Sequence, residues 1–120
     1  MIVVDSAIWI DHLHRREPAL EELMSLRWAL MHPFVLGEIA LGSLRNRGAM
    51  LPPLRDLPQP PVADTQEVFN LIASANLAGS GIGYVDAHLI ASTMLVPDGR
   101  LWTRDKRLFA VALRLGIEAD

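Results

Sequence analysis

The sequence contains no cysteine and a single lysine, and no apolar run approaches the ~18 residues that a membrane-spanning helix needs. Without cysteine the chain can form neither disulfides nor thiolate zinc sites, and nothing points to an oxidising compartment. No basic residues precede the first apolar run, and the acidic residue Asp5 ends that run directly after Val4. We therefore expect no signal peptide, no membrane association and a cytoplasmic protein.

The 120 residues are the length of one domain, and their net charge is −3. This charge argues against a protein that simply coats nucleic acid, because such domains are usually basic. A nuclease is still possible, since acids that hold cations can outweigh a basic rim. All basic residues except Lys106 are arginine, whose planar guanidinium suits phosphate better than lysine does.

Short apolar runs alternate with helical patterns along the chain. We predict strands at 2–4 and 101–103, a candidate edge strand at 62–63, and either a strand or a helix end at 28–31. Predicted helices cover 7–13, the stretch that begins at Pro18, 33 to about 45, 65–75, 84–95 and 105–115. The alternation predicts a parallel sheet that is covered on both faces.

Four acids interrupt apolar faces or follow predicted strands: Asp5, Glu38, Asp86 and Asp105. Each has an ordinary explanation as well. Asp5 and Asp105 are candidate helix N-caps, Asp86 is a candidate first-turn acid, and Glu38 is a candidate solvated surface residue.

Taken together, the acids indicate a shared site. Asp5 and Asp105 follow strands, and ligands gather beyond the carboxyl ends of parallel strands. If the helices that carry Glu38 and Asp86 pack at that edge, the carboxylates converge and repel one another. A hard divalent cation such as Mg²⁺ or Mn²⁺ relieves this repulsion.

Four segments resemble the motifs of the PIN-domain family, in order and spacing across essentially the whole chain. They are Val3-Val4-Asp5-Ser6, Phe34-Val35-Leu36-Gly37-Glu38, Tyr84-Val85-Asp86-Ala87 and Leu101-Trp102-Thr103-Arg104-Asp105. The chain is most similar to the VapC-type toxins. The resemblance implies a single PIN domain over residues 1–120, with a three-layer α/β/α sandwich and a mostly parallel sheet of four to five short strands.

The resemblance also implies a function. VapC-type toxins are endoribonucleases that hold Mg²⁺, or Mn²⁺ in its place, and pair with a cognate antitoxin, commonly as homodimers. The implied metal ligands are Asp5, Glu38, Asp86 and Asp105, with Ser6 and Thr103 in support. Arg104, Lys106 and Arg107 are candidate RNA contacts, or simply a solvated helix start. Lys106 and Arg107 replace a further acid or amide of many relatives, so a second metal site is expected to be weak or to need RNA.

Three rival functions were weighed. A signalling receiver domain needs paired acids after its first strand and a lysine on a late strand, whereas Lys106 lies beyond the last predicted strand. A structure-specific DNA nuclease needs extra domains for which the chain has no room. A degenerate PIN domain that only binds RNA or protein is the main alternative, and the presence of all four acids argues against it. Asp86 and Asp105 are both candidates for the base that accepts the proton of the attacking water.

Overall fold

The computed structural model describes residues 1–119 and contains short parallel strands with helices on both sides. The strands are β1 (Ile2–Val4), β2 (Ala29–Leu30) and β3 (Arg100–Trp102). The helices are α1 (Ser6–His14), α2 (Pro18–Ser25), α3 (Pro33–Leu41), α4 (Arg47–Arg55), α5 (Thr65–Ser74), α6 (Tyr84–Leu95) and α7 (Lys106–Leu115).

The strands of residues 1–119 form one parallel sheet in the order β2-β1-β3. Val3 is in register with Leu30 on one side and with Leu101 on the other. Because all three strands run the same way, their carboxyl ends share one edge of the sheet. The chain leaves β1 at Asp5 and β3 at Thr103, so both residues lie at that edge.

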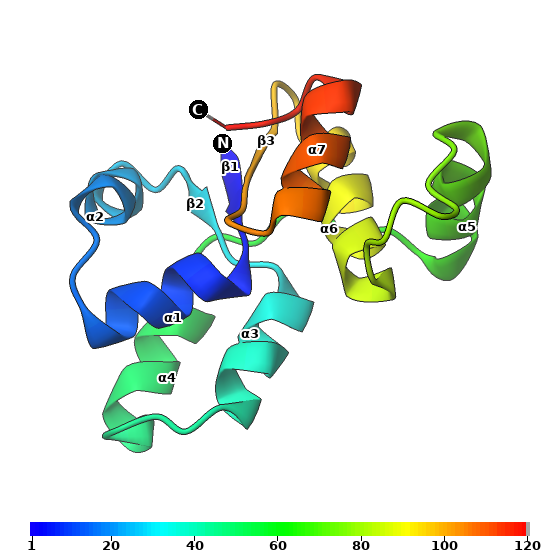
Figure 1. The fold of residues 1–120 in the computed structure, drawn as a ribbon. Coiled ribbons are helices and arrows are strands. Elements are labelled where there is room, and N and C mark those ends of the chain that lie inside the picture. The colour runs from blue at the N-terminus through cyan, green and yellow to red at the C-terminus, as the bar shows by residue number, and fades with distance from the viewer. Residues whose placement is uncertain (120) are drawn as a thin grey trace.

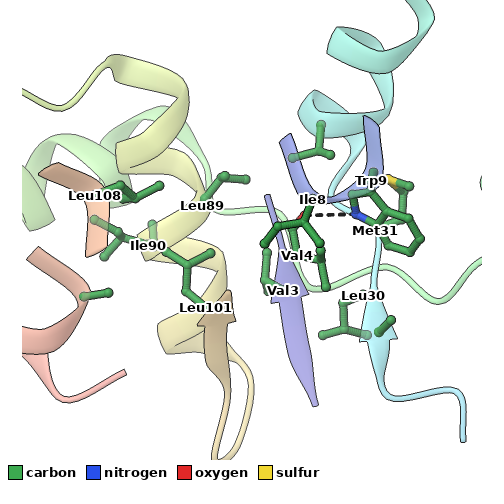
Figure 2. Close-up of a cluster of buried hydrophobic side chains, with 14 of the residues drawn as sticks. Val3, Val4, Ile8, Trp9, Leu30, Met31, Leu89, Ile90, Leu101 and Leu108 are labelled. Carbon is green, nitrogen blue, oxygen red and sulfur yellow. Dashed lines mark hydrogen bonds between the residues drawn. The ribbon is translucent and has the colours of Figure 1, made fainter. Parts of the chain in front are cut away.

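Helices α1 to α4 lie on one side of the strands, and α5, α6 and α7 lie on the other (Figure 1). The core follows from this arrangement. Val3 and Val4 meet Ile8 and Trp9 of α1 on one side, whereas Leu89 of α6 lies across the strand on the other (Figure 2). The indole Nε1–H of Trp9 donates to the Val4 carbonyl at 3.0 Å, which fastens α1 to the strand before it. The predicted α/β three-layer fold is confirmed.

The predicted count of four to five strands was too high, since the described residues contain three. The candidate strand at 62–63 is absent. Of the two alternatives for 28–31, a strand or a helix end, the structure shows a strand, β2. At the β2 edge, the Met31 N–H donates to the Pro58 carbonyl at 2.8 Å. Prolines 58, 60 and 61 lack N–H groups, so this segment cannot extend the ladder. At the β3 edge, residues 117–119 make an isolated bridge to Leu101.

The third predicted helix is shorter than expected, and α4 was not predicted. Helix α3 ends at Leu41, and the guanidinium of Arg47 donates to the Ala40 and Gly42 carbonyls that the helix end exposes. Helix α4 follows, although Pro52 and Pro53 lie inside it. Its burial of Leu51 and Leu54 in the core outweighs the two missing N–H groups in so short a helix. No helix in the described part of the chain has the length and apolar character to cross a bilayer.

Candidate active site

Asp5 is fixed where β1 meets α1. It is the N-cap of α1, and its Oδ1 accepts the Ser6 N–H at 2.8 Å. Its Oδ2 accepts the Thr103 hydroxyl from the end of β3 at 2.7 Å. Only 8% of its surface is exposed, which is low for a carboxylate. The start of α1 and the end of β3 therefore hold this acid by one hydrogen bond each.

Thr103 connects two of the four acids. Besides donating to Asp5, its hydroxyl oxygen accepts the N–H of Asp105 at 3.1 Å. The resemblance implied that Thr103 supports the acids, and the structure places its hydroxyl against both Asp105 and Asp5. The hydroxyl thus ties the start of α7 to the end of β1.

Asp86 and Asp105 both stand at helix starts. Asp86 is in the first turn of α6, where its Oδ2 accepts the Gly83 N–H at 2.9 Å. Asp105 is the N-cap of α7, and its Oδ1 accepts the Leu108 N–H at 2.9 Å. The ordinary explanations of these acids therefore hold. They leave the second carboxyl oxygen of each residue without a protein hydrogen bond among residues 1–119, so capping and a further role are compatible.

Glu38 is an exposed residue of α3, and the electrostatics of its carboxylate identify its charged neighbours. Partial burial of this carboxylate raises its pKa, the charges of Asp5 and Asp86 raise it further, and the Ser6 hydroxyl lowers it. Burial also raises the pKa of Asp86, and the charges of Asp5 and Asp105 add to this effect. The hydrogen bond from Gly83 lowers the pKa of Asp86. Through these charge effects the four predicted acids act on one another.

The cluster has the donor atoms that suit a hard cation, but it does not form a complete coordination site. Every donor is a carboxylate oxygen, the ligand type that Mg²⁺ and Mn²⁺ prefer. In residues 1–119, however, no three Asp, Glu or His side chains stand together as a metal site. Like charges without a counter-ion repel. Side chains of the cluster would therefore have to move before three of them could contact one cation.

The predicted RNA contacts have different surroundings. Arg104 forms ion pairs with Asp11 and with Glu17, the latter at 2.7 Å. Lys106 and Arg107 are exposed in the first turn of α7. The stem of Arg107 crosses the loop before α6 at Gly81. The three residues are therefore neighbours in sequence with unequal freedom to meet a ligand.

Sequence reasoning missed two supports of the site. The Gly83 N–H orients Asp86, and a glycine three residues before an acid at a helix start was the available signal. Behind the acids, the His32 ring accepts the Phe34 N–H at 3.0 Å and contacts the Ser92 hydroxyl at 3.1 Å. Only the position of His32 before Pro33 hinted at this cap, and no sequence signal indicated Ser92, which lies far away in the chain.

Comparison with known proteins gives the family. The chain is 44% identical, over 98% of its length and 94% of the relative's, to Ribonuclease VapC32 of Mycobacterium tuberculosis, with the same values for strains CDC 1551 and H37Rv. No protein-family model matches the chain. Identity at this level over the whole length shows that the chain belongs to the VapC ribonuclease family, as its four motifs predicted.

Proposed function

We propose that this protein is a metal-dependent endoribonuclease and the toxin of a toxin–antitoxin pair. The observation that carries the proposal is the electrostatic state of the acids: burial first, and then the charges of neighbouring acids of the set, raise the pKa of Glu38 and Asp86. Perturbed carboxylates that converge at the carboxyl edge of a parallel sheet are typical of catalytic sites. Membership in a family whose relative is named a ribonuclease supplies the reaction class.

The residues divide the chemistry among them. Asp5, already oriented by Ser6 and Thr103, supplies a fixed ligand, and Glu38, Asp86 and Asp105 supply the others. When bound, Mg²⁺ or Mn²⁺ supplies the positive charge that activates water and offsets charge on the phosphate. A carboxylate of raised pKa accepts a proton more readily. Asp86, whose pKa is raised, is therefore a candidate for this base.

The toxin assignment brings a partner protein with it. Apolar side chains lie exposed on several helices, with Leu41 90% and Phe69 55% exposed. Surface of this kind suits a homodimer and a covering antitoxin. An antitoxin arginine placed among the carboxylates would supply the charge of the cation. Co-expression with an adjacent small reading frame should relieve toxicity and yield a complex. A harmless free protein that purifies alone would contradict the toxin assignment.

Cleavage of total cellular RNA tests the enzymatic proposal. We expect cleavage in Mg²⁺ or Mn²⁺ and none in EDTA. Asp5→Asn keeps the shape of the side chain but removes its charge, so activity should fall at least a hundredfold, equivalent to about 3 kcal/mol. Glu22→Gln, on the exposed surface of α2, is the matched control and should cleave normally. Equal activity of Asp5→Asn would overturn the assignment, and RNA binding without cleavage by wild type would favour the binding-module alternative.

A further inference from the structure

A basic groove lies between α7 and the segment that follows α5. Its volume is about 590 Å³. The side chains that line it include three cations, Lys106, Arg107 and Arg114, and no acid. In a chain of net charge −3 this is a local concentration of positive charge. Such a groove attracts an anionic ligand.

One end of the groove lies beside the acids in the chain. Lys106, which lines the groove, directly follows Asp105, the N-cap of α7. The wall of residues 76–80 precedes Gly83, whose N–H holds Asp86. The charge of Asp105 also raises the pKa of Asp86. From Lys106 the groove follows α7 away from Asp105 for about 12 Å to Arg114, at 1.5 Å per residue.

The side chain of Arg107 packs against the loop before α6. A Cβ atom at Gly81 would lie 2.7 Å from its Cδ and 3.2 Å from its Nε, so the arginine stem occupies the space that the glycine leaves free. Unlike Arg104, Arg107 forms no ion pair with any residue of 1–119. Arg114, further along, donates to the Ala75 carbonyl at 2.8 Å, which holds the far end of the groove together.

We propose that this groove binds the phosphodiester backbone of RNA beside the bond that the acids cut, with Arg107 contacting a phosphate and Gly81 positioning Arg107. The inference rests on the proposed ribonuclease function. A guanidinium matches a phosphate in charge and in its paired N–H groups. Continuity with the acids favours RNA over an acidic protein segment, since a strand held at the acids must leave along a neighbouring surface. Contacts to the backbone add affinity without reading the bases.

RNA binding tests Arg107 apart from catalysis. The probe is a short fluorescent oligouridylate in EDTA, and Asp86→Asn serves as the parent for every variant, so that cleavage does not interfere. Adding Arg107→Gln should weaken binding roughly tenfold and lower the dependence of log Kd on log salt by about 0.7, the value for one phosphate contact on a single strand. Arg55→Gln, an exposed arginine at the end of α4, is the matched control and should bind like the parent.

Two glycines test the positioning role. Gly116 and Gly81 both have positive φ, +72° and +86°, so alanine strains the backbone at either position. A Cβ atom at Gly116, which lies outside the groove, meets nothing within 4 Å, whereas one at Gly81 meets Arg107. Gly81→Ala should therefore weaken RNA binding about as much as Arg107→Gln does, while Gly116→Ala lowers the melting temperature similarly and binds RNA normally. Combined with Arg107→Gln, Gly81→Ala should have no further effect on binding.

The outcomes separate this inference from the proposed function. If wild type cleaves RNA but Arg107→Gln binds it like the parent, the groove assignment is wrong and the ribonuclease assignment stands. If Gly116→Ala and Gly81→Ala weaken binding equally, Gly81 does not act through Arg107. If wild type neither cleaves nor binds RNA, both proposals fail.

Discussion

The site has a buried framework and an exposed rim, and the two differ in how their polar groups are paired. In the framework, Thr103 bonds to Asp5, and His32 contacts Ser92. On the rim, partial burial raises the pKa values of Glu38 and Asp86, and the charges of other acids raise them further. A satisfied polar network stabilises the fold, whereas an uncompensated one keeps free energy available for a ligand. The difference predicts that framework changes will lower stability and that rim changes will lower activity.

Thr103→Val tests the framework most strongly. The substitution keeps the shape of the side chain, but it removes the donor to the buried Asp5 and the acceptor for the Asp105 N–H. We expect the free energy of unfolding to fall by about 2–3 kcal/mol. Thr93→Val is the control, because the buried Thr93 hydroxyl bonds only to the Leu89 carbonyl of its own helix. Equal losses in urea titrations of the two variants would show that Thr103 is not a special support.

The second prediction concerns pH and His32. Burial, together with the charge of His88, lowers the pKa of His32 from 6.5 to about 4. Between these values the unfolded chain binds a proton that the folded chain does not, so stability is lost as the pH falls through this window. At about 1.4 kcal/mol per pH unit, the loss from pH 7 to 5 approaches about 2 kcal/mol.

His32→Asn isolates this effect. Asparagine can still cap the Phe34 N–H, although it does not titrate. The variant should begin less stable at pH 7, because it loses the Ser92 contact, and then lose less stability than wild type on going to pH 5. Parallel pH profiles for the two proteins would contradict the assigned cause.

The smallest expected effect belongs to the rim. Because the pKa of Asp86 is raised, the folded protein loses stability as the pH rises from the ordinary pKa of an aspartate through the raised one. Asp86→Asn should therefore melt slightly higher than wild type in EDTA at neutral pH. Its free energy of unfolding should exceed that of wild type by about 1 kcal/mol or less after solvent screening. In Mg²⁺ the difference should narrow or reverse, because wild type gains binding free energy. A variant that melts lower than wild type in EDTA would show that capping outweighs repulsion.

The sequence indicated the four candidate acids because most of them stand next to strong local signals. Asp5 and Asp105 follow short apolar strands, and Asp86 begins a long helix. Helix α4 escaped prediction because Pro52 and Pro53 signal a break, whereas burial of Leu51 decides in favour of a helix. The bond from Thr103 to Asp5 and the contact from Arg107 to Gly81 join distant segments. Such contacts depend on how the strands and loops pack, which no local pattern records.

Titration with Mn²⁺, followed by the electron paramagnetic resonance signal of the free ion, tests the shared site most directly. We predict that wild type removes Mn²⁺ from solution and that Asp5→Asn, Glu38→Gln, Asp86→Asn and Asp105→Asn each bind it at least roughly tenfold more weakly, about 1.4 kcal/mol or more. Glu22→Gln should bind Mn²⁺ like wild type. Failure of wild type to bind Mn²⁺, or equal binding by all four variants, would contradict the claim that the acids form one cation site.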